Sequence, residues 1–318
     1  MITKPRVGVS ACLVGRDVRY DGGHRKEDVL DRLSAFLDFV PICPEVEIGL
    51  GTPRPRIDLH ATSDPLRPRM IQEGTDLTGR MESYAHRRLT EDSFCGYLFK
   101  ARSPSCGIRG VRLFDRDGEI REVGVGVFAR IFMERFSSAV VFDENILADP
   151  YGLESMVSAV FTVHRYRWAA QDAARSGEPN SADALLRCHR RHRVLLAARV
   201  DTDEDRPDPA DLRGGPEERA RYARSLARLL ERPATRDGHR RALLLLLDEL
   251  ESLLPPGGRE RREVMAVSQH LVHSYSEAAD LHDTLIGIAE LAALHAPALL
   301  DDLYLRPHPP ELDLYRDL

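Results

Sequence analysis

The chain has 318 residues, a formal net charge of −6, 42% hydrophobic residues and 30% charged residues. This length allows two domains with separate cores, and this composition is typical of soluble globular proteins. The acidic balance argues against a protein that coats nucleic acid indiscriminately, and the longest apolar stretch, 242–247, is too short to cross a bilayer. The N-terminal residues predict no secretory signal, and five irregularly spaced cysteines predict no disulfide framework, so we expect a cytoplasmic protein without a membrane span.

The first half of the chain alternates between strand-like and helix-like patterns. We expect strands at 7–13, 39–43 and 96–101, and helices at 26–37 and 77–89. Such alternation favours an α/β fold, Rossmann-like, in which helices cover a largely parallel sheet.

A hairpin and two further helices are expected between residues 110 and 163. Residues 110–114 and 120–127 predict a hairpin around Arg116-Asp-Gly118. Residues 133–163 predict two more helices, separated by the turn residues Asp149-Pro150-Tyr151-Gly152.

Beyond about residue 165 the strand patterns disappear. Helices are expected at 182–199, 217–231, 239–254, 259–277 and 281–294. The interpretation is an α/β domain over 1–165, followed by an all-α helical bundle domain over 166–318.

Three short segments that follow predicted strands each carry one cysteine among small residues. They contain Cys12, Cys43 and Cys106, within Ser-Ala-Cys-Leu-Val-Gly, Cys-Pro-Glu-Val-Glu and Ser-Pro-Ser-Cys-Gly. Open α/β sheets place their sites at the ends of strands, so the three thiols are expected to meet in a metal or cluster site. Small buried cysteines at tight turns remain an equally good interpretation of the spacing, and this is the one we favour for Cys95 and Cys188.

The spacing of the three cysteines in the sequence limits the kinds of metal site that they could form. Structural zinc sites usually show closely spaced cysteine pairs, and none occurs here. A 4Fe–4S cluster held by three cysteines would leave one iron open to act as a Lewis acid. A zinc-stabilised fold stays open as an alternative.

Polar residues beside the cysteines are candidates for catalysis. Glu45 follows Cys43 closely, and Ser103 and Ser105 precede Cys106. A carboxylate can move protons and a hydroxyl can hold an anion or a water. Glu47 is expected instead to cap a helix or to pair with Arg54 or Arg56.

These motifs, together with Val18-Arg-Tyr-Asp-Gly-Gly23, resemble the signature of the thiouracil desulfidase family. The resemblance implies a 4Fe–4S cluster on the three cysteines named above and non-redox removal of sulfur from a thiocarbonyl base. It also implies that Glu45 transfers protons and that Ser103 orients substrate or water. Asp21 either helps to position the ring or only forms its turn, and Ser105 is a candidate for substrate binding.

The second half resembles the helical domain found in two-domain tRNA 4-thiouridine desulfidases of the RudS type. The matching stretches are 189–199 and 304–312. That resemblance implies binding of tRNA by the helical domain. Basic side chains that could follow a phosphate backbone gather at Arg190, Arg191 and Arg193, although charge alone slightly favours a solvated helix face here.

The sequence therefore predicts an iron–sulfur-dependent desulfidase that acts on 4-thiouridine in tRNA. Two alternatives stay open. One is desulfuration of free thiouracil or 4-thiouridine monophosphate, and the other is a non-catalytic iron–sulfur sensor that binds RNA or a partner protein.

Overall fold

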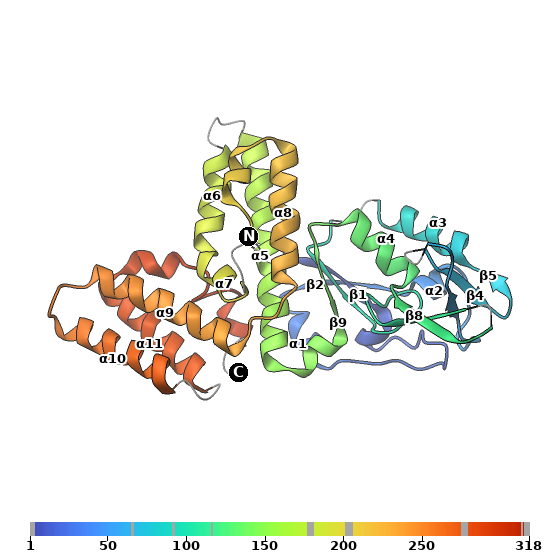
Figure 1. Ribbon diagram of the computed structural model, residues 1–318, viewed down its shortest axis with the longest axis horizontal. Coiled ribbons are helices and arrows are strands. Elements are labelled where there is room, and N and C mark those ends of the chain that lie inside the picture. The colour runs from blue at the N-terminus through green and yellow to red at the C-terminus, as the bar shows by residue number, and fades with distance from the viewer. Residues whose placement is uncertain are drawn as a thin grey trace. The chain divides into compact units, whose positions relative to one another are not determined.

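The computed structural model describes residues 4–64, 67–90, 93–115, 117–176, 181–200, 206–274 and 279–312, together with Leu314 (Figure 1). The chain divides into two compact units, 1–148 and 149–318. The predicted division at residue 165 instead falls inside helix α5 (Pro150–Ser176).

The first unit contains a four-stranded parallel sheet in the order β2-β1-β6-β9. Its strands are β1 (Arg6–Ser10), β2 (Asp38–Ile42), β6 (Gly96–Phe99) and β9 (Val140–Asp143). Strand β6 is buried throughout and β1 is buried from its second residue onward, because strands of a parallel sheet are usually covered on both faces. The α/β fold with a parallel sheet is as predicted.

Short helices connect and flank these strands. They are α1 (Val29–Leu33), α2 (Pro44–Glu47), α3 (Thr78–Arg88) and α4 (Val127–Arg135), with the 3-10 turns η1 (Ala11–Val14) and η2 (Glu144–Ala148). Helices were predicted throughout 133–163, and this was wrong over strand β9. The short apolar run of β9 cannot be told from a buried helix by periodicity alone.

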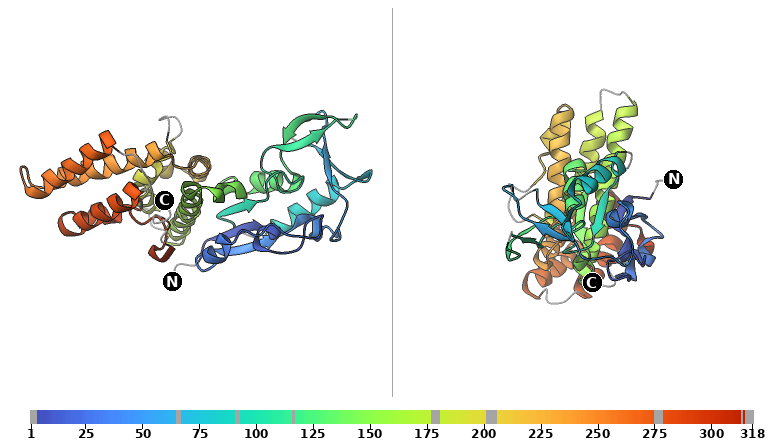
Figure 2. Two further views of the ribbon diagram at one scale, coloured as in Figure 1. Left: turned by 90° about the horizontal axis from the view of Figure 1, so that it is seen from below. Right: turned by 90° about the vertical axis from the view of Figure 1, so that its right-hand side faces the viewer.

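A second sheet of five strands lies in the same unit, in the order β5-β4-β3-β7-β8. Its strands are β3 (Asp58–His60), β4 (Arg69–Gln72), β5 (Thr75–Asp76), β7 (Val111–Phe114) and β8 (Ile120–Gly124). Strands β7 and β8 form the predicted antiparallel hairpin, although Arg116 lies outside the described residues. Figure 2 shows both sheets from two further sides.

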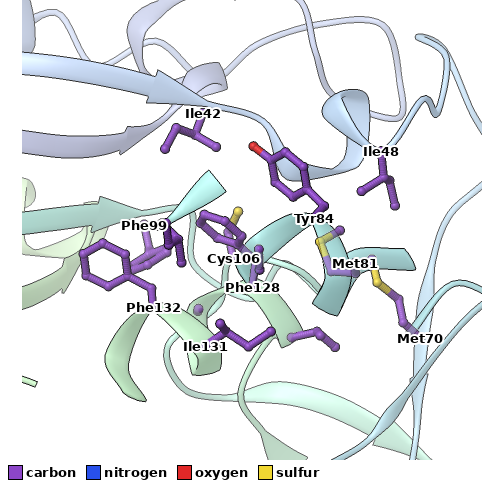
Figure 3. Close-up of a cluster of buried hydrophobic side chains, with 14 of the residues drawn as sticks. Ile42, Ile48, Met70, Met81, Tyr84, Phe99, Cys106, Phe128, Ile131 and Phe132 are labelled. Carbon is purple, nitrogen blue, oxygen red and sulfur yellow. The ribbon is translucent and has the colours of Figure 1, made fainter. Parts of the chain in front are cut away.

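Aromatic rings dominate the core between the parallel sheet and helix α4 (Figure 3). Tyr97 stacks on Phe99 with a centroid distance of 3.8 Å, and Phe132 meets both rings edge-on. Edge-on pairs such as those of Phe132 are a favourable arrangement of aromatic rings. The core therefore anchors β6 immediately before the segment that carries Cys106.

The second unit consists of helices. They are α5 (Pro150–Ser176), α6 (Ser181–Arg191), α7 (Arg193–Ala197), α8 (Pro216–Leu230), α9 (Arg236–Leu253), α10 (Arg259–Ser274) and α11 (Ala279–His295), with η4 (Pro209–Arg213), η5 (Pro297–Asp301) and η6 (Pro310–Leu312). The predicted helices agree with these in position, except that the one expected at 182–199 is two helices, α6 and α7, and that residues 275–277 of another lie outside the described residues. Helices α6 and α8 both pack on α5. None of the described helices is both long and apolar enough to cross a membrane.

Close packing in the parallel sheet leads to a first prediction. Gly8 of β1 lies opposite Tyr97, and a Cβ atom at Gly8 would lie 2.1 Å from that ring. Gly8→Ala should therefore destabilise the protein by about 1–3 kcal/mol, as overpacking does. Chemical denaturation of the full-length variant and of wild type measures this difference in the free energy of unfolding.

Gly79→Ala is the control, because a Cβ at Gly79 meets nothing within 4 Å. It should leave stability unchanged or slightly higher, since alanine favours a helix. Equal stability of the Gly8 variant and wild type would contradict the packing described here.

Candidate active site

Three adjacent parallel strands bring the three predicted cysteines to one edge of the sheet. Cys12 lies in η1 after β1, Cys43 directly follows β2 and caps α2, and Cys106 lies in the turn that follows β6. Strand β1 pairs with both of the others, so their carboxyl ends share an edge. All three residues line a single cavity of about 390 Å³. Sequence reasoning predicted this convergence.

The three thiols are shielded from solvent. Cys12 and Cys106 are buried, and Cys43 is half-buried. Burial raises the pKa of Cys12 to about 11 and raises the pKa of Cys43 and of Cys106. The charge of Cys43 raises the pKa of the other two further, so the thiolates would repel one another. A cationic centre bound between them would offset this repulsion and displace their protons.

The set of three cysteines in one cavity fits a cluster. Among the described residues, no three His, Cys, Asp or Glu side chains are placed to hold one metal ion. In a cluster each thiolate binds a different iron, so the sulfur atoms lie farther apart than around one ion. Three cysteines in one cavity without a fourth thiol fit a 4Fe–4S cluster that keeps one iron free of protein ligands.

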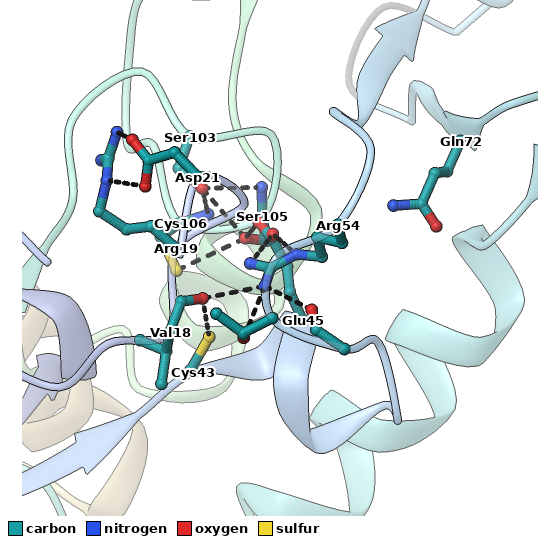
Figure 4. A network of polar contacts seen from close by, with 12 residues as sticks. Val18, Arg19, Asp21, Cys43, Glu45, Arg54, Gln72, Ser103, Ser105 and Cys106 are labelled. Atoms are coloured by element: carbon teal, nitrogen blue, oxygen red, sulfur yellow. Dashed lines mark hydrogen bonds and ion pairs between the residues drawn. The ribbon is translucent and has the colours of Figure 1, made fainter. Parts of the chain in front are cut away.

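Glu45 lies in helix α2 and is held on both sides of its carboxylate (Figure 4). Arg54 donates from Nε and Nη2 to Oε2, at 3.0 and 2.5 Å. Ser105 donates from Oγ to the other oxygen, Oε1, at 2.6 Å. The carboxylate therefore has a fixed orientation at the cavity wall.

Ser103 completes this network. Its Oγ lies 3.0 Å from Oγ of Ser105 and accepts the backbone N–H groups of Ser105 and Cys106, at 3.3 and 3.1 Å. Ser105 is buried, whereas Ser103 is only half-buried. Ser103 thus offers a hydroxyl to the cavity, and Ser105 joins it to Glu45.

Asp21 does not line this cavity. Arg19 donates from Nε and Nη2 to its two carboxylate oxygens, at 3.2 Å each, and Gly23 N–H donates to it at 3.2 Å. The hydrogen bond from Arg19 lowers the pKa of Asp21. Asp21 closes its own turn and holds Arg19, which does line the cavity.

The three arginines expected to contact RNA lie in the second unit and have different surroundings. Arg191 donates from Nε to the carbonyl oxygen of Asp301 at 3.0 Å. Arg193 forms ion pairs with Glu249 and Asp302. Arg190 is exposed. Arg191 and Arg193 therefore connect parts of the helical unit, and Arg190 is the one of the three without such a contact among the described residues.

The sequence did not reveal that basic side chains gather around the cavity. Basic residues that line the cavity are Arg19, Arg25, Arg54, Arg56, Lys100, Arg102 and Arg112. Only the fold reveals them, because they come from segments far apart in the chain. The expected pairing of Glu47 with Arg54 or Arg56 was wrong, since Tyr84 donates to Glu47 at 2.6 Å and Arg54 is bound to Glu45.

The Ser-Pro-Ser-Cys turn rests directly on Gly126, the residue before helix α4. A Cβ atom at Gly126 would lie 2.6 Å from the carbonyl carbon and oxygen of Ser105 and 2.9 Å from the nitrogen of Cys106. Gly126 also donates its N–H to the oxygen of Gly107 at 2.7 Å. The position of Cys106 thus depends on the absence of a side chain here.

Gly126→Ala is therefore expected to displace Cys106 and to reduce the iron bound after anaerobic reconstitution at least severalfold. Gly79→Ala is expected to bind as much iron as wild type, because Gly79 does not line the cavity and has room for a Cβ atom. Iron and acid-labile sulfide analysis measures both. Wild-type iron content in the Gly126 variant would show that this contact does not position the cysteine.

The part of the chain that forms this site is similar to known proteins. Residues 7–144 match the sequence model of the family described as 2-thiouracil desulfurase. A solved structure described as the [4Fe-4S]-dependent thiouracil desulfidase TudS is 31% identical in sequence to this chain. The alignment covers 46% of this chain and 94% of that protein, and the TM-score is 0.36. No curated protein matches the chain. Through residues 7–144, the chain belongs to the 2-thiouracil desulfurase family.

Proposed function

We propose that this protein is a 4Fe–4S-dependent, non-redox desulfidase of thiolated pyrimidines, and that its substrate is 4-thiouridine in tRNA. The observation that carries the proposal is the meeting of Cys12, Cys43 and Cys106 in one cavity beside the Glu45 network. Membership of the 2-thiouracil desulfurase family supports it.

The cofactor proposal rests on the donor set. Cys12, Cys43 and Cys106 would hold the cluster, and the TudS protein that resembles this chain is described as [4Fe-4S]-dependent. When bound, such a cluster supplies a Lewis acid for the sulfur of a thiocarbonyl group through its iron without a protein ligand.

The chain's own residues supply proton transfer and orientation. Glu45 accepts a proton from water as the water oxygen adds to the ring carbon, and gives that proton to sulfur when the carbon–sulfur bond then breaks. Ser103 orients that water through its hydroxyl at the cavity. Overall, the thiocarbonyl group and water are converted into a carbonyl group and hydrogen sulfide. Both protons of the water leave with the sulfur, and no electron is gained or lost.

Two features support a nucleic acid rather than a free base as the substrate. The cavity is lined by arginines, of which Arg25, Arg56, Arg102 and Arg112 are exposed and suited to phosphate. The helical unit exposes Arg187, Arg190 and Arg228, and also Trp168, whose side chain could stack on a base. A base within folded RNA must leave its stack to enter the cavity, so RNA binding includes local unstacking.

The cysteine assignment predicts a clear pattern among variants. Ala substitution of Cys12, Cys43 or Cys106 should abolish both the iron–sulfur absorbance and sulfide release from 4-thiouridine monophosphate after anaerobic reconstitution. Cys95→Ala is the matched control, because Cys95 is buried in the same unit but does not line the cavity. It should keep both properties.

Two results would contradict this assignment. One is full cluster absorbance with any of the three cavity cysteines replaced. The other is a wild-type protein that holds the cluster yet releases no sulfide from any thiolated pyrimidine, as expected of a sensor.

The tRNA substrate is tested with the full chain by comparing sulfide release from 4-thiouridine-containing tRNA and from 4-thiouridine monophosphate. We expect a kcat/KM for tRNA that is higher by on the order of tenfold or more, and that falls more steeply with salt because several phosphates are neutralised. Unthiolated tRNA should inhibit competitively. Equal or better use of the nucleotide at low salt would overturn tRNA as substrate and leave the desulfidase proposal standing.

A further inference from the structure

Arg54 is a buried cation at the cavity wall, with only 5% of its side chain exposed. It directs two of its donors, Nε and Nη2, to a single oxygen of Glu45, Oε2. The second oxygen, Oε1, is thereby left to the hydroxyl of Ser105. An arginine fork more often grips both oxygens of a carboxylate, so this arrangement divides the two oxygens between two partners.

The third nitrogen of the same side chain reaches a different segment. Nη1 of Arg54 donates to the carbonyl oxygen of Val18 at 2.9 Å and to that of Gly51 at 3.1 Å. The backbone N–H of Arg54 donates to Tyr20 O at 2.9 Å. Arg54 therefore joins the segment 18–20 to helix α2, and both line the cavity.

The hydroxyls beyond Glu45 have a defined hydrogen-bond direction. Ser103 Oγ accepts two backbone N–H groups, so its own hydrogen remains for Ser105 Oγ or for a molecule in the cavity. Ser105 in turn donates to Glu45. A continuous path thus leads from the cavity to Oε1 of Glu45, and it depends on that oxygen facing Ser105.

We propose that Arg54 is a positioning residue for desulfuration: by holding Oε2 of Glu45 it keeps Oε1 directed at Ser105 and the cavity. This inference rests on the proposed function, in which Glu45 moves the proton. Rotation of an unheld carboxylate would break the contact with Ser105, and misplacement of a catalytic group by about 1 Å can cost on the order of 100-fold in rate.

The rival explanation is an ion pair that serves stability alone. Breaking a buried pair destabilises a protein because one charge is left unpaired, whatever its role in catalysis. The test must therefore separate effects on kcat from effects on folding and on cluster binding. Arg130 offers a matched control, because its side chain is 11% exposed in the same unit, pairs with Glu82 and Glu134, and does not line the cavity.

Arg54→Gln should lower kcat for 4-thiouridine monophosphate on the order of 10–100-fold, with KM changed less than about threefold. Arg54→Lys should recover part of the loss, because it restores the charge without the two-pronged contact. Arg130→Gln should lower the thermal midpoint of the cluster-free protein but leave kcat within about twofold of wild type. Iron and sulfide content normalise every rate.

A double-substitution cycle identifies the residue through which Arg54 acts. Glu45→Asp shortens the carboxylate and withdraws it from both partners. If Arg54 acts through Glu45, the double variant should lose much less than the product of the two single losses in kcat. The thermal midpoints of the cluster-free proteins should be non-additive as well, which gives a measure that does not need the loaded enzyme.

Three results would overturn the inference. They are unchanged kcat in Arg54→Gln, a loss explained fully by lower cluster content, and multiplicative losses in the double variant. If Arg54→Gln does not fold, the same comparisons with Arg54→Lys decide the question. A wild-type protein without desulfidase activity would instead refute the proposed function, and the two failures are thereby distinguished.

Discussion

The site depends on the parallel pairing of β1 with β2 on one side and with β6 on the other. This pairing places three strand ends at one edge, and each is followed by a turn that carries a cysteine. No cysteine needs a close partner in sequence, because the sheet supplies the proximity. Gly8 packs against the ring of Tyr97, which holds β1 close to β6. Gly126 packs against the backbone of Ser105 and Cys106, which holds the turn that carries Cys106.

The same edge gathers the groups that we propose to move protons. Glu45 follows Cys43 directly, and Ser103 and Ser105 precede Cys106, so the segments that bring thiols also bring a carboxylate and two hydroxyls. Arg54 adds a cation that satisfies the buried carboxylate and ties a further loop to it. A buried charge without such a partner would be costly, which explains why the carboxylate is enclosed on both sides.

Local patterns predicted the parts of the fold that have strong periodicity or turn signals. The first strands, the hairpin and the helices of the second unit belong to this group. Strands β3, β4 and β5 were not predicted, because each strand has four or fewer residues and each contains a charged residue. Motifs identified Glu45 and the three cysteines as candidates. Arg54 was expected to pair with Glu47, but its partner is Glu45, because Tyr84 occupies Glu47 in the folded chain and the sequence does not show which carboxylate faces the cavity.

We propose that Cys12, Cys43 and Cys106 together hold one cluster, whose fourth iron would have no protein ligand. Mössbauer spectroscopy of the ⁵⁷Fe-reconstituted full-length protein tests it most directly, because it resolves irons with different ligands. The account predicts a 4Fe–4S spectrum in which one iron in four is distinct and shifts when a thiopyrimidine is added. Four equivalent irons, or iron bound only as single ions, would contradict it.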